Sequence, residues 1–285
     1  MVRPMAVTLE QIVADTRVEV ARRKAEVPLD EMRARAEQTP DPRNFFARLM
    51  NHAEDFGFAI IAEVKRRSPS AGLIRPEYAP DNKGADGFDP AHIATRYFHS
   101  GAAAISCLTD GPHFGGELGF IERIKSVVPL PVIRKDFIVD PWQLYETRAA
   151  GADAVLLIAE CLNEREIVDM MILAQQLQLT VLLEVHSMEN LLRVRPHIGF
   201  PHPAYCFLGI NNRDLTTMTT DIAHTLRLVD LVDNPGVLVS ESGIRTHEDL
   251  EKLKQAGVQL ALVGEHLMRQ DDPGDALAEL IGRFG

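Results

Sequence analysis

Charged and amide side chains follow several short apolar runs, and their types and spacing make them the first candidates for chemistry. Lys135 comes directly after the run Val132–Arg134, and Glu63 and Lys65 alternate at the end of the run Ala59–Val64. The other members of this set are Glu184, Asn211, Arg213 and Glu241. A lysine and carboxylates that meet in one place can donate and accept protons during a reaction.

A simple packing role explains one such residue better than it explains the whole set. A lone lysine or carboxylate at a strand end is most simply solvated or ion-paired. Several buried charges together each cost on the order of several kcal/mol unless pairing or function compensates. We therefore interpret the set as one rim of a ligand site, because ligands bind at the carboxyl ends of neighbouring parallel strands.

The chain from Phe58 almost to its end alternates between apolar runs and helical patterns. Buried strands are predicted at Ala59–Val64, Ala103–Leu108, Val132–Arg134, Ala154–Ile158, Val181–Val185, Cys206–Ile210, Val237–Ser240 and Leu260–Val263. Helices are predicted at Pro90–Ser100, Leu118–Val127, Asn163–Leu177, Asp221–Val232 and His247–Ala256. Eight strands that each precede a helix predict an α/β fold, a (β/α)8 TIM barrel.

The length of 285 residues fits one large barrel, so we predict a single domain over residues 1–285. Residues 58–285 hold the eight βα units. Residues 1–52 are predicted to form extra N-terminal helices that pack on the barrel, the first of them capped by Thr8. A helix is also predicted after Asp140-Pro141, which places Trp142 beside the site.

The connection between Lys65 and Pro90 is too long for an ordinary βα loop. It carries several prolines and glycines and lies on the predicted ligand side of the barrel. A lid over the site and an insertion without a role explain it about equally well.

Glycines follow the seventh and eighth predicted strands, where this fold commonly binds phosphate. Gly243 lies in Glu241-Ser242-Gly243-Ile244, and Gly264 begins Gly264-Glu265. Glycine lets backbone N–H groups approach an anion closely, although turns alone also need glycine. Its presence after both strands favours a phosphate site, with Ser68 or Ser70 as a further donor.

Composition excludes several other classes of function. The formal net charge is −11 with acidic residues spread along the chain, which argues against a nucleic-acid or membrane surface but permits an anionic small molecule. Three widely spaced cysteines, at 107, 161 and 206, predict a reduced, cytoplasmic protein, and no signal peptide pattern opens the sequence. No histidine pairs with a second ligand at metal-binding spacing on a strand end, so we predict no catalytic metal and no cofactor.

Seven segments in this order resemble the indole-3-glycerol phosphate synthase family of tryptophan biosynthesis. They are Ile61–Ser70, Ile105–Asp110, Arg134–Ile138, Leu183–Val185, Gly209–Leu215, Glu241–Ile244 and Leu262–Glu265. The resemblance covers nearly the whole chain. It implies the ring closure of 1-(2-carboxyphenylamino)-1-deoxyribulose 5-phosphate to indole-3-glycerol phosphate, with loss of carbon dioxide and water, and contact with other enzymes of the pathway.

The resemblance also implies a role for each site residue. Lys135 matches a general acid, Glu184 a carboxylate that assists dehydration, and Glu63 and Lys65 a pair that orients and polarises the substrate. Asn211 completes the catalytic group. Further matches are substrate-binding Ser68, Phe137, Arg213 and Glu241, and phosphate-binding Ser242, Gly243, Gly264 and Glu265. Nearby carboxylates favour charged Lys135 whereas Lys65 and burial oppose it, so we expect its pKa near the operating pH.

Three features depart from the family pattern, namely a long segment after Ser70, Pro112-His113 before Phe114, and His266 after Gly264-Glu265. Two alternatives remain at this point. One is another phosphosugar barrel, such as a phosphoribosyl anthranilate isomerase, which leaves the carboxyl group in place. The other is a barrel that only binds a phosphosugar, and the intact Lys135 and Glu184 argue against it.

Overall fold

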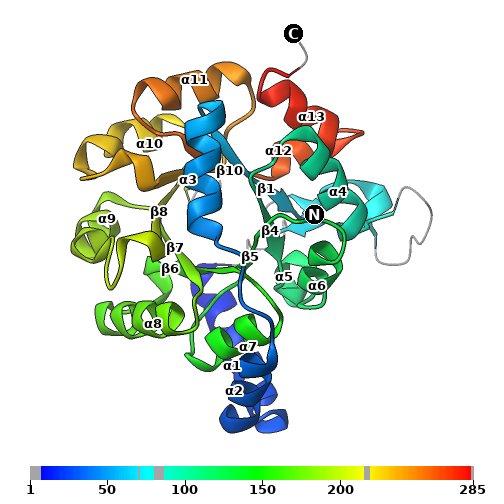
Figure 1. Cartoon of the computed structure of the whole chain (residues 1–285), viewed down its shortest axis with the longest axis vertical. Helices are drawn as coiled ribbons and strands as arrows, with labels where there is room; N and C mark the ends of the chain where they lie inside the picture. Colours follow the sequence, from blue (N-terminus) through cyan, green and yellow to red (C-terminus); the bar gives the residue numbers. More distant parts are fainter. Residues whose placement is uncertain (1–7, 70, 80–86, 215–218, 284–285) are drawn as a thin grey trace, which may run out of the picture.

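Eight parallel strands form a closed barrel in the computed structural model, which describes residues 8–69, 71–79, 87–214 and 219–283 (Figure 1). The strands pair in the order β1, β10, β9, β8, β7, β6, β5, β4 and back to β1. Their bounds are β1 Ala59–Val64, β4 Ala104–Leu108, β5 Val132–Lys135, β6 Ala154–Ile158, β7 Thr180–Val185, β8 Cys206–Asn211, β9 Leu238–Glu241 and β10 Leu260–Val263. The predicted barrel is confirmed, and no strand end differs from its prediction by more than one residue.

Helices surround this barrel and precede it in the chain (Figure 1). The α-helices are α1 Leu9–Glu26, α2 Leu29–Gln38, α3 Phe45–Phe56, α4 Pro90–Ser100, α5 Gly111–Phe114, α6 Phe120–Lys125, α7 Trp142–Ala149, α8 Glu164–Gln176, α9 Met188–Val194, α10 Ala223–Leu228, α11 His247–Gln255, α12 Glu265–Met268 and α13 Pro273–Leu280. Short 3-10 turns are η1 Pro76–Tyr78, η2 Ala159–Cys161, η3 Arg195–His197, η4 Pro203–Tyr205, η5 Val229–Leu231 and η6 Pro235–Val237.

Local signals explain where these helices begin and end. Thr8 caps α1 by accepting the N–H of Gln11 at 3.3 Å, as predicted. The predicted helix Asp221–Val232 is shorter, because the Asp221 carboxylate accepts the N–H of Ala223 from outside the helix. Gly101 ends α4 with φ 99°, a left-handed conformation that favours glycine.

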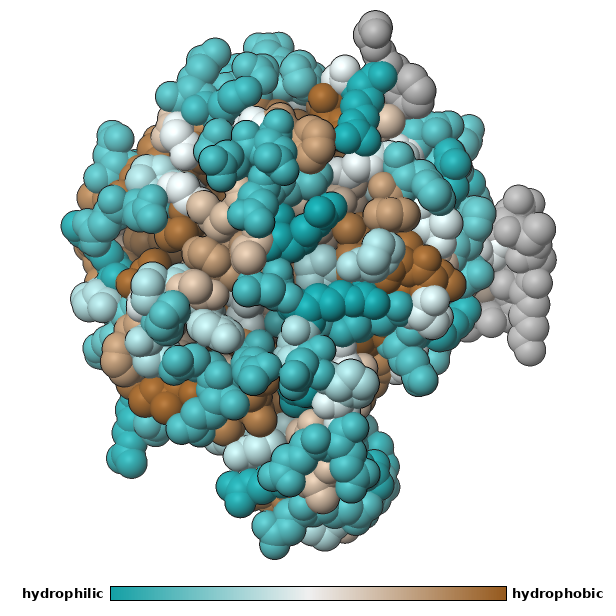
Figure 2. Space-filling view, in the orientation of Figure 1, coloured by the Kyte–Doolittle hydropathy of each residue, from teal (hydrophilic) through white to brown (hydrophobic). Residues whose placement is uncertain are grey.

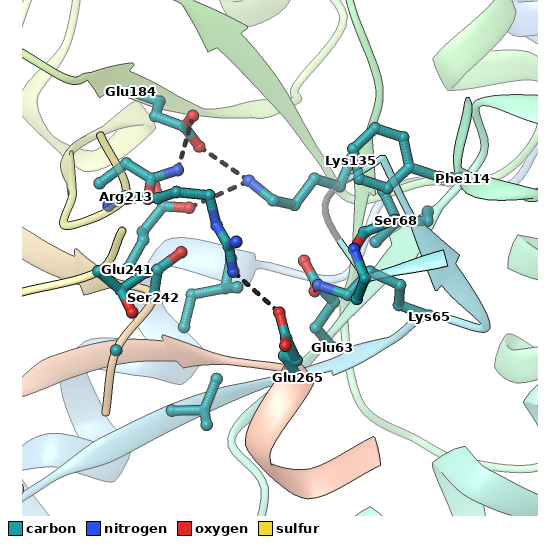
Figure 3. A pocket seen from close by; sticks show the side chains of 18 of the residues that line it. Glu63, Lys65, Ser68, Phe114, Lys135, Glu184, Arg213, Glu241, Ser242 and Glu265 are labelled. Carbon is teal, nitrogen blue, oxygen red and sulfur yellow. Dashed lines mark hydrogen bonds and ion pairs between the residues drawn. The ribbon is translucent and has the colours of Figure 1, made fainter. Parts of the chain in front are cut away.

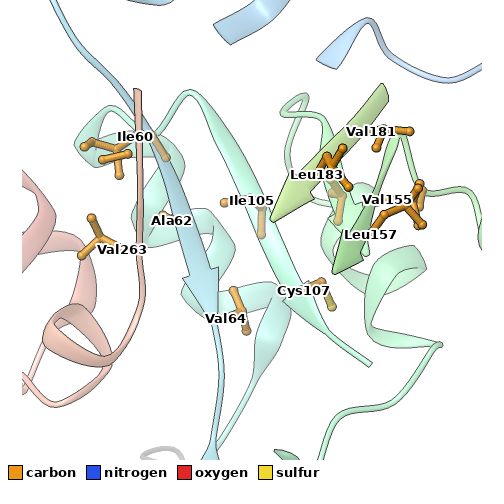
Figure 4. Close-up of a cluster of buried hydrophobic side chains, with 14 of the residues drawn as sticks. Ile60, Ala62, Val64, Ile105, Cys107, Val155, Leu157, Val181, Leu183 and Val263 are labelled. Carbon is orange, nitrogen blue, oxygen red and sulfur yellow. The ribbon is translucent and has the colours of Figure 1, made fainter. Parts of the chain in front are cut away.

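Two apolar layers are built by the period-two alternation of the strands. Ile61, Ile133 and Leu182 belong to the layer inside the barrel. The alternate residues point outward and pack beneath the helices, as Ile60, Ala62, Ile105 and Leu183 do (Figure 4). Both faces of each strand are thus covered, which explains the continuous apolar runs.

The N-terminal helices pack on the barrel in two places. Helix α3 lies across one end of it (Figure 1), where Phe45 and Leu49 are buried against the amino ends of the strands. Helices α1 and α2 lie beside α7, and Arg23 of α1 binds Glu146 of α7 at 2.6 Å. The prediction that Trp142 lies beside the ligand site is wrong. Its indole is buried among Val20 and Met32 and donates to the Val27 carbonyl at 3.0 Å.

The long connection after β1 has structure of its own within the described residues. A short hairpin, β2 Arg67–Ser68 with β3 Gly72–Leu73, is followed by the turn η1. Ile74 and Tyr78 are buried in the outer core, and Arg75 donates to the Asp271 carbonyl at 2.9 Å. This first part of the segment is therefore fixed to the barrel, while residues 80–86 lie outside the described residues.

Hydrophilic side chains dominate the face shown in Figure 2, with apolar patches between them. Within the part of the chain that the structure describes, no helix is long and apolar enough to cross a bilayer. Cys107 and Cys206 are buried, Cys161 is half-buried, and all three are free thiols. Burial raises the pKa of Cys161 and of Cys206 to about 12, so both thiols stay protonated.

Candidate active site

A cavity of about 740 Å³ lies at the carboxyl ends of the barrel strands. Every site residue predicted from the sequence lines it. These residues are Glu63, Lys65, Ser68, Lys135, Phe137, Glu184, Asn211, Arg213, Glu241, Ser242, Gly243, Gly264 and Glu265. The structure thus brings together side chains from six strands and the loops after them, whereas Ser70 lies outside the described residues.

Lys135 occupies the centre of this site (Figure 3). Its Nζ lies 2.8 Å from Oε2 of Glu184 and 3.0 Å from Oε2 of Glu241. Asn211 donates to Oε1 of Glu184 at 3.1 Å. Glu63 of strand β1 and Lys65, which directly follows that strand, form a second ion pair. Two lysines and three carboxylates therefore face one cavity that is large enough for a small molecule.

The charges of this cluster fix the protonation state of Lys135. Burial by itself would lower the pKa of the ammonium group, but Glu184, Glu241 and Glu63 raise it above the ordinary value for lysine. The expectation of a pKa near the operating pH is therefore wrong. The sequence predicted that Glu63 and Glu184 lie near Lys135. Only the closed barrel brings Glu241 into contact with Lys135 as well. Lys135 is a protonated donor throughout the neutral range.

Two glycines provide the space that the carboxylates of Glu241 and Glu63 occupy. Gly209 of β8 lies against Glu241, and a Cβ at Gly209 would overlap the Glu241 carboxylate. Gly264 after β10 lies in the same way against Glu63. The absence of a side chain at both positions thus lets adjacent strands present carboxylates into a narrow barrel end.

The predicted phosphate side of the cavity combines glycine turns with cations. Ser242 and Gly243 adopt positive φ angles of 65° and 79° after β9. Glu265 begins α12 and is neutralised by Arg213 at 2.9 Å and Arg269 at 2.8 Å. Arg245 and His266 also line the cavity. Backbone amides and the arginine side chains can hold an anion there despite the net charge of −11 for the whole chain.

The opposite wall is apolar, and sequence reasoning identified only part of it. Phe137 and Phe114 lie with their rings 6.1 Å apart. Leu9 and Ile12 of α1 also line the cavity, although the sequence predicted only that this helix packs on the barrel. Nε2 of His113 lies 3.3 Å from Oδ2 of Asp15 in α1, so the departure Pro112-His113 lies beside the helix that covers the site. An apolar wall with aromatic side chains suits an aromatic group.

His186 is the principal residue that sequence reasoning missed. It lines the cavity, and its Nε2 lies 3.2 Å from Oε1 of Glu184. A signal was present, because His186 follows Glu184 in the same period-two phase at the end of β7. Among the described residues, no group of three or more metal-ligating side chains is arranged around a common point.

The fold and the site together define a class of protein. It is a (β/α)8 barrel enzyme whose central lysine and carboxylates face both an apolar wall and an anion site. Solved structures agree on the fold. A 3-hexulose-6-phosphate synthase superposes with a TM-score of 0.60 at 15% identity, covering 80% of this chain and 100% of that chain. The tryptophan synthase alpha chain of Legionella pneumophila gives 0.53 at 15% identity, covering 84% and 95%.

Sequence comparisons are more specific. The indole-3-glycerol phosphate synthase family model matches residues 9–280. The enzyme of that name from Rhodospirillum rubrum is 45% identical over 98% of this chain and 100% of its own length. That from Rhodopirellula baltica is 46% identical over 93% of this chain and 95% of its own. The chain therefore belongs to the indole-3-glycerol phosphate synthase family, which consists of carboxy-lyases of tryptophan biosynthesis.

Proposed function

We propose that this cavity closes the indole ring of 1-(2-carboxyphenylamino)-1-deoxyribulose 5-phosphate, with Lys135 as the general acid. The observation that supports this role most directly is the contact of Lys135 with two buried carboxylates. These contacts keep the lysine charged until an oxyanion develops on the substrate ketose oxygen. The proton then stabilises that oxygen while the aromatic ring carbon attacks.

The remaining roles follow the arrangement of the cavity. Glu184, held by Asn211 and Lys135, assists the dehydration that follows loss of carbon dioxide. The ion pair of Glu63 with Lys65 orients and polarises the substrate from strand β1. Because these groups come from separate strands of one barrel, their positions are rigid, and the substrate binds in a conformation close to that needed for ring closure.

The two ends of the substrate fit the two ends of the cavity. In this proposal the phosphate lies against Ser242, Gly243, Gly264 and Glu265, with Ser68, Arg213 and Glu241 as further binding residues. The carboxyphenyl ring lies against Phe137. This placement leaves the reacting carbons near Lys135, between the anion side and the apolar wall.

Replacement of Lys135 by methionine tests the acid directly. Lys135→Met keeps the length of the side chain but removes the proton, so we expect turnover to fall by about 10²- to 10⁴-fold. Purified protein is given the carboxyphenylamino-deoxyribulose phosphate without added metal, and indole fluorescence and carbon dioxide release are followed. Lys252→Met, on the exposed face of α11, is the matched control and is expected to retain full activity.

The same assay separates the alternatives. Conversion of the substrate without release of carbon dioxide would favour an isomerase, and binding without turnover in the wild type would favour a non-catalytic barrel. Full turnover by Lys135→Met would show that Lys135 is not the general acid. The family membership already argues for the ring closure.

Three broader expectations belong to this proposal. We propose that residues 1–285 act as one domain, supported by the ion pairs of Arg23 with Glu146 and Lys24 with Asp140. We also propose a cytoplasmic location and contact with other enzymes of tryptophan biosynthesis, as the family suggests. Cell fractionation and co-purification of the native protein test these two.

A further inference from the structure

The imidazole of His186 lies between two carboxylates at the edge of the cavity. Its Nε2 is 3.2 Å from Oε1 of Glu184, and its Nδ1 is 3.2 Å from Oε2 of Glu160. The side chain is only 8% exposed. Glu184 lines the cavity, whereas Glu160 lies behind His186 in the turn η2 after the neighbouring strand β6.

Glu160 also fixes the backbone that carries His186. Its Oε1 accepts the N–H of His186 at 2.8 Å and the side-chain amide of Asn190 at 3.0 Å. On the other side, Nε2 of His224 lies 3.1 Å from the His186 carbonyl oxygen. The turn after β7 is therefore held from η2, α9 and α10, and the imidazole has little freedom to rotate.

We propose that His186, held by Glu160, is a positioning residue that fixes the orientation of the Glu184 carboxylate for the ring-closing reaction. This inference rests on the proposed role of Glu184. Lys135 holds Oε2 of that carboxylate, while Asn211 and His186 share Oε1. With His186 removed, Oε1 keeps the single neutral donor Asn211, and the carboxylate turns more freely about its last bond.

The contact depends on the protonation of the imidazole. An ionised Glu160 can only accept, so Nδ1 of His186 carries a hydrogen. Nε2 carries a hydrogen only in the imidazolium form, and the charged ring then forms an ion pair with Glu184. In the neutral form its lone pair faces the carboxylate oxygen and repels it. The orienting contact is therefore present when His186 is charged and is lost when it is neutral.

The groups that face His186 set the pH at which this happens. They are Glu184 from β7, Glu160 from η2, Lys135 from β5 and His224 from α10. Burial lowers the pKa of His186, but Glu160 and Glu184 outweigh it and raise the pKa above the ordinary value of histidine. The contact is complete at lower pH and is lost as the pH rises through this raised pKa. The pKa of Lys135 is raised as well, from a much higher starting value, so Lys135 loses its proton at higher pH than His186 does.

The test is the pH profile of kcat from pH 5.5 to 9.5 for the wild type and three variants. His186→Phe removes the donor, and we expect kcat at neutral pH to fall by about tenfold or more with KM changed little. His186→Gln keeps a donor at the same reach without titrating, so most of kcat should return and the decline of kcat on the alkaline side of neutrality should disappear. Glu160→Gln should move that decline to lower pH.

Unchanged kcat in His186→Phe, or the same alkaline decline in His186→Gln as in the wild type, would overturn the inference. If His186→Phe fails to fold, the profiles of His186→Gln and Glu160→Gln decide. Glu184→Gln separates this inference from the proposal on which it rests. Full turnover by Glu184→Gln would show that Glu184 has no catalytic role. Loss of turnover in Glu184→Gln, together with wild-type kinetics in the His186 variants, would show that only the role of His186 is wrong.

Discussion

At the scale of single residues, the two carboxylates that hold Lys135 differ in their surroundings. Burial would raise the pKa of Glu184, but Lys135 and His186 lower it below the ordinary range. Glu241 is buried with fewer donors, and its Oε1 has no hydrogen-bond partner among the described residues. Burial and the charge of Glu184 raise the pKa of Glu241. Of this coupled pair, Glu184 therefore loses its proton at lower pH than Glu241 does.

The position of Glu241 depends on Gly209, which gives a prediction at this scale. In Gly209→Ala the new Cβ overlaps the Glu241 carboxylate, so the side chain must move away from Lys135. We expect kcat to fall by about 10²-fold, as a misplaced group near the chemistry can cause. Gly119→Ala is the control, because a Cβ at Gly119 meets no atom within 4 Å. Steady-state kinetics of both proteins check this, and equal activities would contradict it.

At the scale of elements, a buried charge network joins the N-terminal helix to the strand that carries Lys135. Arg23 of α1 binds Glu146 of α7, and Glu146 lies 2.9 Å from the fully buried Arg134 of β5. Arg134 also binds Asp136 at 2.8 Å, and Asp136 accepts from Thr109 at 2.6 Å after β4. The residues on both sides of Lys135 in the sequence are therefore fixed from outside the barrel.

The network predicts a large loss of stability in Glu146→Gln. That change leaves the buried charge of Arg134 with Asp136 as its remaining carboxylate, and breaking a buried pair in this way costs about 3–5 kcal/mol. Glu26→Gln removes an exposed partner of Arg22 on α1 and should cost less than about 1 kcal/mol. Urea unfolding of both variants measures the two free energies. Similar small losses in both would show that Arg134 needs no second carboxylate.

At the scale of the whole molecule, Trp142 reports on how the N-terminal helices join the barrel. It is the single tryptophan of the chain, and its indole is buried between α7 and the first two helices. The helices α1 and α3 also cover opposite ends of the barrel, α1 at the cavity and α3 at the amino ends of the strands. Undocking of the N-terminal segment would therefore expose the indole and open the site together.

If residues 1–285 form one domain, unfolding should be a single transition. We expect the urea midpoints from Trp142 fluorescence and from far-ultraviolet circular dichroism to coincide, as for one cooperative unit. A fluorescence change at clearly lower urea than the loss of helix signal would show that α1 and α2 detach first. Saturating substrate should raise both midpoints together, because a ligand that binds only the folded state stabilises it by mass action.

The barrel and the charged strand-end residues of its site could be predicted from the sequence alone. Short apolar runs from Ala59–Val64 to Leu260–Val263 that alternate with helical patterns are typical of strands covered on both faces. Parallel strands bring their carboxyl ends together, so Glu63, Lys135 and Glu184 had to meet at one rim. Both conclusions depend on local periodicity and on the chain order, which a sequence contains in full.

Which side chains touch, and hence which of them are charged, follows from the closed barrel and its packed helices. The contact of Lys135 with Glu241 joins strands β5 and β9, and it reversed the expected direction of the lysine pKa. Likewise, His186 is held by Glu160, which follows a different strand, and Trp142 is buried by side chains of α1 and α2. Distances of about 3 Å between residues far apart in the chain follow from barrel closure and helix packing, which no local pattern encodes.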